Sequence, residues 1–414
     1  MSDPHRRDVA VVLSGGGING ILLELGFLKR LREDPMWPRI GWIYGTSAGA
    51  LSGAMAALDR LEELEEFLLV LQAEDVFRPR RLWQLPLGGL HDYTLPDTIA
   101  ERLGGEEELG SSLHASEIEL VVFATDVGEP IDGDRLRNFE LVYPSHSTPP
   151  ETMGRAILAS AAISAIVLPV RVGDAIATDG GWIRNFPLEH AYANPAVATI
   201  AAFRYVSAYP PVDVTFLERL RDRLELFRAV PPVRALLAEL RLAEERYRKG
   251  EPAHYPELIT RLMRVAINRN TFLEERYADE RDLSVEELHR LREDIVAAST
   301  AAALPWRRRK LRAQLEERFA STAFPFRHDR QVPRVVVRAT AGEDALEPMF
   351  RGEPPWPEES KRALIARGYR ITDEELARGA DLVAGEEGRQ GPGQAVGPHA
   401  GDRSGPDGSG PDRD

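Results

Sequence analysis

A serine that could act as a nucleophile lies at the centre of the sequence Gly45-Thr46-Ser47-Ala48-Gly49. This G-x-S-x-G pattern follows the apolar run 40–44 and precedes 50–54, which are mostly small residues. The order strand, tight turn and helix is typical of a nucleophile elbow, which holds a serine hydroxyl at a helix start. Gly45 and Gly49 fit it, because strand and helix pass too closely there for a Cβ atom. The same residues also fit an ordinary Gly-Ser turn, so the pattern alone does not assign catalysis.

A second set of reactive groups is predicted in the backbone of the loop 15–20, Gly-Gly-Gly-Ile-Asn-Gly. The loop follows the Val-rich run 8–14 and precedes 21–32, where apolar residues have helical spacing. Glycines let successive N–H groups converge, and the following helix adds a partial positive charge. Such a loop could stabilise an oxyanion or hold a phosphate. Since a strand, a glycine loop and a helix also make the dinucleotide fingerprint, a non-catalytic nucleotide- or phosphate-binding module is the alternative function.

The second strand and a later aspartate bear on this choice. A dinucleotide site requires an acidic residue on the second strand, where it binds the ribose hydroxyls. This chain has Ser47 there instead. Further along, Asp179-Gly180-Gly181 ends a predicted short strand. An aspartate so placed could accept the serine proton, although an Asp beside two glycines is also a common turn-former.

Taken in order, three motifs resemble those of the patatin-like phospholipase family: GGGING at 15–20, GTSAG at 45–49 and DGG at 179–181. The connecting sequences ATD (124–126), ASAAISAIVLPVRV (159–172) and TDGGWIRNFPL (178–188) strengthen the resemblance. It extends over about residues 8–205 and, more loosely, over 332–376. The fold that it implies is α/β, a patatin-like three-layer α/β/α sandwich with a mostly parallel central sheet.

The resemblance also implies an activity and a set of site residues. The activity is that of a serine acyl hydrolase, of lipase, phospholipase or lysophospholipase type, acting on lipid esters through an acyl-serine intermediate. No cofactor or metal is expected. Ser47 would be the nucleophile and Asp179 the general base of a Ser–Asp dyad. The oxyanion hole would consist of the amides of Gly15, Gly16 and Gly17, and the supporting motif positions are Asn19, Gly20, Gly45, Gly49, Gly180 and Gly181.

Two positions depart from the family pattern. Relatives often carry Arg or Lys where this chain has Asn19, which keeps a hydrogen-bond donor but lacks the charge. If that charge binds a head group, this chain would favour other esters. Ser164 stands where proline is common, and we expect no effect of it on the chemistry.

Two further polar residues offer alternative roles. His190, eleven residues after Asp179, is the best candidate for the histidine of a Ser–His–Asp triad. A histidine on a short helix is more often structural. Asp126 ends a predicted strand on the side of the sheet where sites form. Asp126 could orient the surroundings of Asp179 or cap a turn, and we favour the structural role.

The chain divides by composition into four segments. Residues 8–211 are expected to form the catalytic core, and 212–330 a helical insert or lid with separate helices at 256–268 and 285–303. Residues 331–384 would complete the core with a strand and two helices, at 358–367 and 373–383. An irregular excursion is expected at 75–96, which is rich in Pro and Gly. Residues 385–414 contain too few apolar side chains to offset their ordering entropy, so a disordered tail is predicted.

Composition limits the partners. The 414 residues include 52 basic and 66 acidic side chains, and the net charge of −14 argues against nucleic acid. The chain has no cysteine and no apolar run long enough to span a bilayer, which favours the cytoplasm. We interpret the basic cluster 306–312 (WRRRKLR) as a solvated face of a helix. Peripheral contact with anionic lipid is the alternative.

Overall fold

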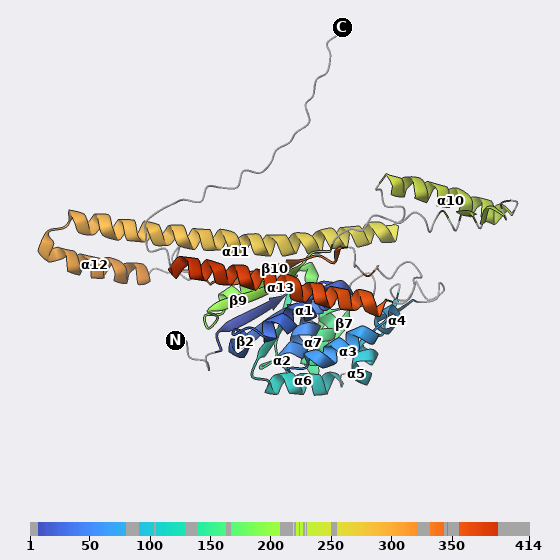
Figure 1. Cartoon of the computed structure of the whole chain (residues 1–414), viewed down its shortest axis with the longest axis horizontal. Helices are drawn as coiled ribbons and strands as arrows, with labels where there is room; N and C mark the ends of the chain where they lie inside the picture. Colours follow the sequence, from blue (N-terminus) through green and yellow to red (C-terminus); the bar gives the residue numbers. More distant parts are fainter. Residues whose placement is uncertain are drawn as a thin grey trace, which may run out of the picture.

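The computed structural model describes residues 7–79, 91–102, 105–128, 139–162, 167–207, 230–249, 255–321, 332–342 and 356–387, with single positions among 218–228 and Leu346. Within these residues it is a mixed α/β fold around one large sheet (Figure 1). No helix in the described part of the chain is long and apolar enough to cross a membrane. Most of the predicted tail, residues 388–414, lies outside the described residues, as does Ser164.

Eight strands form the main sheet, in the order β10-β9-β1-β2-β5-β8-β7, with β6 also paired to β5. The predicted mostly parallel sheet is confirmed, because β10, β9, β1, β2 and β5 all run in the same direction. The pairs β5–β6, β5–β8 and β7–β8 are antiparallel. The strands are β1 (Val9–Leu13), β2 (Ile40–Thr46), β5 (Glu119–Asp126), β6 (Glu140–Pro144), β7 (Val170–Val172), β8 (Ala175–Asp179), β9 (Thr199–Tyr205) and β10 (Arg334–Ala339).

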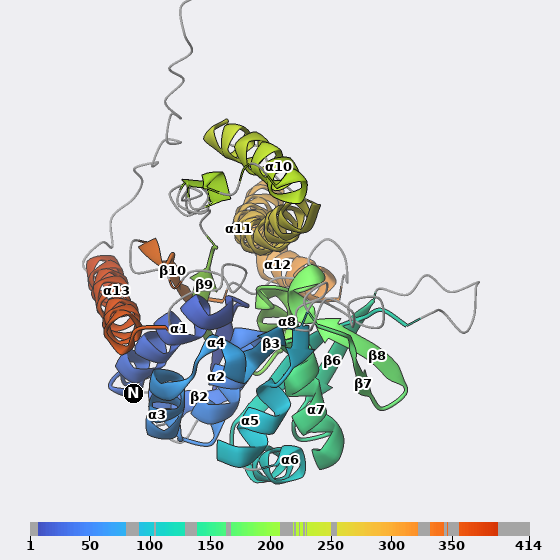
Figure 2. The same cartoon turned by 90° about the vertical axis from the view of Figure 1, so that its right-hand side faces the viewer.

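Both faces of this sheet are buried, and side chains alternate between them. On β1, Val9, Val11 and Leu13 belong to one apolar cluster, and Ala10 and Val12 belong to the other. This two-residue period is that of a strand covered on both sides. The first cluster is completed by α1 (Gly17–Arg32), α2 (Ala48–Ala57), α3 (Leu61–Val70), α7 (Pro150–Ser160) and α13 (Glu358–Glu387). The second includes residues of α8 (Leu188–Ala193) and α11 (Tyr255–Ala302), which lie across the sheet from α1, α2 and α3 (Figure 2).

The segment expected to be irregular, residues 75–96, contains regular structure where it is described. A short antiparallel pair, β3 (Phe77–Pro79) and β4 (His91–Tyr93), lies between α4 (Ala73–Val76) and α5 (Leu95–Arg102). Residues 80–90 lie outside the described part of the chain. The other helices with described bounds are the 3₁₀ helices η1 (Trp37–Arg39) and η3 (Gly180–Trp182), α6 (Glu106–Ala115), α10 (Pro231–Arg248) and α12 (Pro305–Ala320).

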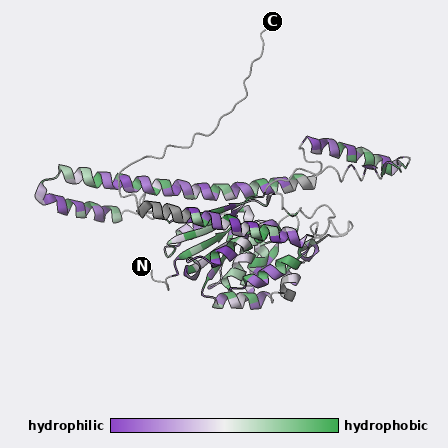
Figure 3. Cartoon of the chain, viewed as in Figure 1, coloured by the Kyte–Doolittle hydropathy of each residue, from purple (hydrophilic) through white to green (hydrophobic). Residues whose placement is uncertain are grey.

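The two helices predicted at 256–268 and 285–303 are instead parts of one helix, α11, of 48 residues. No glycine or proline occurs between residues 257 and 304, so nothing in the sequence ends the helix. Helices α11 and α12 form a long hairpin that extends beyond the sheet (Figure 1). Hydrophilic residues predominate along this hairpin, in contrast to the strands of the core (Figure 3).

A second pair of predicted helices, at 358–367 and 373–383, also forms one helix, α13, which continues to Glu387. It therefore extends past the predicted start of the tail at residue 385. The helix continues through Gly368, where the absence of a side chain allows α13 to pack closely against α1. A Cβ atom there would lie 2.1 Å from the carbonyl oxygen of Leu23, and one on Gly26 would lie 2.1 Å from that of Ile365.

Candidate active site

The turn between β2 and α2 has the backbone of a nucleophile elbow. β2 ends at Thr46, α2 begins at Ala48, and Ser47 between them has φ of 54° and ψ of −117°. A positive φ is strained for serine, and such strain is concentrated at functional sites. A Cβ atom on Gly45 would lie 2.3 Å from the carbonyl oxygen of Gly49. A Cβ atom on Gly49 would lie 2.6 Å from the carbonyl oxygen of Leu13 on β1, so neither glycine leaves room for a side chain.

Sheet register brings the aspartate to the serine. Thr46 pairs with Phe123 on β5, and Asp179, the last residue of β8, pairs with the next residue, Ala124. The Ser47 side chain lies near enough to the Asp179 carboxyl to lower its pKa, against the effect of burial. Both are buried, with 6% and 4% of their surfaces exposed.

The environment of Asp179 makes its carboxylate more basic than usual. Burial raises the pKa of Asp179 to about 6, although the neighbouring Ser47 side chain and the hydrogen bond from the Gly181 amide act in the opposite direction. The Gly181 N–H donates to Oδ1 at 2.7 Å. A Cβ on Gly180 would lie 2.3 Å from the carbonyl oxygen of Phe123, so the glycine lets this turn pass close to β5. A carboxylate with this pKa could accept a proton near neutral pH.

The glycine loop lies directly beside Ser47. A Cβ atom added to Gly15 would be 3.2 Å from Cβ of Ser47. Gly16 is the N-cap of α1 and Gly17 its first residue, so no intrahelical carbonyl can reach their N–H groups. Gly17 has φ of +57°, which favours glycine. A Cβ on Gly16 would lie 2.6 Å from Cα of Gly20, which explains why both motif positions lack a side chain.

Gly15 differs from the other two glycines of the predicted oxyanion hole. Its N–H donates to the backbone oxygen of Asn185 at 3.0 Å. The segment after Asp179 therefore contacts the glycine loop through Asn185, and the Gly15 amide is already hydrogen-bonded. Only Gly16 and Gly17 of the predicted set keep amides that could serve an oxyanion.

Asn19 has a structural contact. Its Nδ2 donates to the backbone oxygen of Leu346 at 3.2 Å, and its Oδ1 accepts from the Leu346 amide at 2.8 Å. The side chain therefore ties the glycine loop to the C-terminal part of the chain. An amide with both of its polar atoms in contact with backbone is suited to ordering the loop.

His190 is held by other residues. Its Nε2 lies 2.9 Å from Oε1 of Glu140, and its ring packs on Phe123 with centroids 4.6 Å apart. Burial raises the pKa of Glu140, but hydrogen bonds from His190 and Arg184 outweigh it and hold that pKa at about 2. This contact favours a structural role for His190 over a place in a triad.

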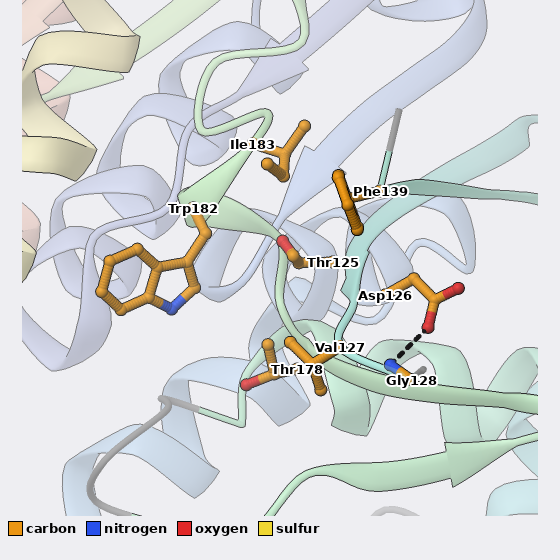
Figure 4. A pocket seen from close by; sticks show the side chains of 8 residues that line it. All are labelled: Thr125, Asp126, Val127, Gly128, Phe139, Thr178, Trp182 and Ile183. Carbon is orange, nitrogen blue, oxygen red and sulfur yellow. Dashed lines mark hydrogen bonds between the residues drawn. The ribbon is translucent and has the colours of Figure 1, made fainter. Parts of the chain in front are cut away.

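Asp126 also has a local structural contact, since its Oδ1 accepts from the Gly128 amide at 2.9 Å (Figure 4). It lines a pocket of about 450 Å³, whose wall is mostly apolar. Thr178 and Trp182, which flank the Asp179 turn, also line this pocket. The full set is Thr125, Asp126, Val127, Gly128, Phe139, Thr178, Trp182 and Ile183.

A buried serine fixes the backbone of the nucleophile. Ser160, at the end of α7, accepts from the Ser47 amide at 2.8 Å and donates to the Phe123 carbonyl at 2.6 Å. It belongs to the ASAAIS stretch of the family resemblance. No pattern in the sequence assigned Ser160 a role.

Hydrogen bonds from helix α11 hold the loop that follows Asp179. Asn270 donates to the backbone oxygen of Trp182 at 2.6 Å. Asn185, 2% exposed, donates from Nδ2 to Thr271 Oγ1 at 2.6 Å. A Cβ on Gly181 would meet Oδ1 of Asn185 at 2.8 Å and Oδ1 of Asp179 at 2.9 Å. Asn185 thus lies between the aspartate turn and the glycine loop, and sequence reasoning missed it.

No group of three or more His, Asp or Glu side chains that could hold a metal ion occurs among the described residues. Here the Ser47 hydroxyl and the Asp179 carboxylate meet beside a helix N-terminus. Acyl transfer through a serine needs a nucleophile, a base and hydrogen-bond donors for an oxyanion, and these groups could supply the three.

A family model agrees with the resemblance found in the sequence. Residues 11–192 match the model of the patatin-like phospholipase family. The chain is 25% identical over 182 residues to an uncharacterized NTE family protein of Mycobacterium tuberculosis, over 44% of this chain and 27% of that protein. It thus spans about a quarter of the length of that relative. The crystal structure of VipD from Legionella pneumophila matches with a TM-score of 0.38 and 11% identity, over 91% of this chain and 68% of that one.

Proposed function

We propose that this chain, which carries a patatin-like phospholipase domain over residues 11–192, hydrolyses carboxylic esters of lipids through an acyl-serine intermediate. The observation that carries the proposal is the position of the Ser47 side chain beside a buried Asp179 whose pKa is raised to about 6. An unperturbed aspartate, with a pKa near 3.9, is too weak a base for a serine hydroxyl. The raised pKa of Asp179 brings it closer to that of a serine hydroxyl, which supports a Ser–Asp dyad.

In the first half of the proposed reaction, Ser47 Oγ attacks the ester carbonyl carbon as its proton moves to Asp179. The amides of Gly16 and Gly17 stabilise the resulting oxyanion, and loss of one such donor typically costs about 3 kcal/mol of transition-state stabilisation. The C–O bond to the leaving alcohol then breaks, and the alcohol takes the proton from Asp179. An acyl-serine remains.

In the second half, water attacks the acyl carbon and gives a proton to Asp179. Collapse of this second tetrahedral intermediate breaks the bond to Ser47 Oγ, which recovers the proton. The carboxylic acid leaves and the dyad returns to its starting state. One carboxylate therefore serves both steps, and no metal or cofactor is required by this scheme.

We also propose that residues 212–330 cover the catalytic core as a helical insert. The contacts from Asn270 and Thr271 on α11 to the loop after Asp179 support this. We propose the core segments 8–211 and 331–384 and the tail 385–414 from the sequence, with α13 continuing to Glu387. The burial of Trp356 and Leu364 against the main apolar cluster supports a core contribution from the C-terminal segment.

A fluorophosphonate probe tests the proposed chemistry, because it phosphonylates an activated serine. The parent protein should be labelled and should hydrolyse a short-chain nitrophenyl ester. Ser47→Ala should abolish both, and Asp179→Asn should lower turnover by at least about a thousandfold. His190→Gln serves as the matched control and should retain activity.

Two results would contradict the proposal. Unlabelled parent protein that binds a nucleotide tightly would favour the phosphate-binding module. A folded Asp179→Asn protein as active as the parent would remove the dyad even if Ser47 were labelled.

A further inference from the structure

The turn that joins α11 to α12 extends away from the core. Figure 1 shows the two helices as a hairpin whose turn lies beyond the sheet. At 1.5 Å per residue, the turn lies about 45 Å along α11 from Thr271, which contacts the active-site loop. We call residues 303–312 the hairpin tip. It has no role in the proposed chemistry, so its composition calls for another explanation.

The hairpin tip has a concentrated positive charge in an acidic protein. Between residues 295 and 315 there are five basic side chains and no acidic one. The whole chain, by contrast, carries −14. A local field of the opposite sign to the rest of the surface favours an anionic partner at this point.

Three of the five cations are available to a partner. Arg308 donates to the carbonyl oxygens of Ala303 and Ala301, and Arg312 pairs with Glu316 at 2.8 Å. Within the part of the chain that the structure describes, Arg307, Arg309 and Lys310 are exposed and form no ion pair. The charge of these three is not neutralised by the protein itself.

Large apolar side chains stand among these cations. Trp306 is 75% exposed and Leu304 is 53% exposed. On a helix, Arg309 and Lys310 lie three and four residues after Trp306 and share its face. α12 has no buried residue, so the core does not account for the tryptophan.

We propose that the hairpin tip docks on an anionic lipid bilayer, with Trp306 and Leu304 in the interface and Arg307, Arg309 and Lys310 against the head groups. An exposed tryptophan among cations suits the boundary between head groups and acyl chains. The choice of a lipid surface rests on the proposed function, because a lipid ester hydrolase must reach its substrate at a membrane. A nucleic acid would satisfy the cations but leave Leu304 without a partner.

The test is co-sedimentation of the full chain with phosphatidylcholine vesicles, with and without about 30% phosphatidylserine, at low salt. The parent should bind the anionic vesicles and release at high salt. Each basic side chain near such a surface contributes roughly fivefold to binding, so R307Q/R309Q/K310Q should weaken it about a hundredfold. Trp306→Ala should weaken binding at least about tenfold through the lost apolar area.

A matched control removes three positive charges elsewhere. Arg276, Arg290 and Arg362 are exposed and each pairs with a glutamate one turn away. The R276Q/R290Q/R362Q protein should bind anionic vesicles as the parent does. If it loses binding as the tip variant does, net charge and not the hairpin tip is responsible, and the proposal fails.

Other outcomes separate this proposal from the proposed function. Ser47→Ala should still bind vesicles, and the tip variants should hydrolyse a water-soluble ester at the parent rate. If the parent protein hydrolyses that ester but does not bind anionic vesicles, the docking proposal fails while the proposed function stands. Tighter binding to an oligonucleotide than to vesicles, or equal binding by the Trp306→Ala protein, would also overturn it.

Discussion

Asn185 donates from Nδ2 to Oγ1 of Thr271 at 2.6 Å, and this contact joins the loop after Asp179 to helix α11. Thr271 Oγ1 in turn donates to the backbone oxygen of Ile267, which leaves it as the acceptor from Asn185. The backbone oxygen of Asn185 receives the Gly15 amide. One residue therefore connects the base, the glycine loop and the long helix.

Thr271→Val should lower kcat/KM by about ten- to hundredfold, because a small displacement of catalytic groups is costly. It should also lower the free energy of unfolding by about 1–3 kcal/mol, since the Asn185 amide loses its acceptor in a buried place. Thr300→Val is the matched control. The Thr300 hydroxyl likewise donates to the backbone oxygen four residues earlier in α11, that of Val296. Thr300 lies far along the helix from the active-site loop. Ester hydrolysis and chemical denaturation of both variants test this, and equal activity would contradict it.

The rate of ester hydrolysis should follow the ionisation of Asp179. The base must be deprotonated, and burial raises its pKa to about 6, so kcat/KM should rise with pH through about 6 and then level off. A pH profile measured with a non-ionising nitrophenyl ester shows this. A histidine base titrates in the same region, so the profile must be repeated with His190→Gln. If the rise of kcat/KM with pH disappears in His190→Gln, the histidine and not Asp179 is responsible for it.

The sequence predicted those parts of the site that depend on local pattern. The Val-rich run of β1 and the apolar run of β2 form adjacent parallel strands, as their composition indicates. The elbow follows from Gly45 and Gly49, because close contact of strand and helix excludes any larger residue. In each case the physical cause lies within a few residues of the pattern.

Contacts between distant segments could not be predicted in this way. Asn185 and Thr271 are 86 residues apart, and no pattern in a single sequence indicates that they meet. Ser160 looks like any small residue at a helix end, yet it accepts the Ser47 amide. A helix end was predicted at residue 367, whereas α13 continues through Gly368, which allows its close approach to α1.

Asp179 should make the protein less stable as pH rises. Its pKa is about 6 in the folded state and near 3.8 in an unfolded chain, so the folded state holds more protons between these values. The free energy of unfolding therefore falls as pH rises through this window, by up to about 3 kcal/mol. In Asp179→Asn this part of the pH dependence should vanish.

Chemical denaturation of both proteins at about pH 4.5 and about pH 7.5 measures the difference. Burial also raises the pKa values of Glu24 and Glu274, but these groups are present in both proteins and cancel. The same loss of stability between the two pH values in parent and variant would show that Asp179 is not the source.

Ser160→Ala should lower turnover by about tenfold while leaving Ser47 and Asp179 in place. The Ser47 amide would lose its acceptor, and the strained backbone of the elbow would be held less firmly. Ser145→Ala is the matched control, because Ser145 is equally buried and its hydroxyl accepts the Leu120 amide at 3.0 Å. Both substitutions should cost about 1–3 kcal/mol of stability, so thermal melts should agree while ester hydrolysis differs. A parallel fall in activity for Ser145→Ala would mean that general destabilisation, and not the elbow, accounts for the effect.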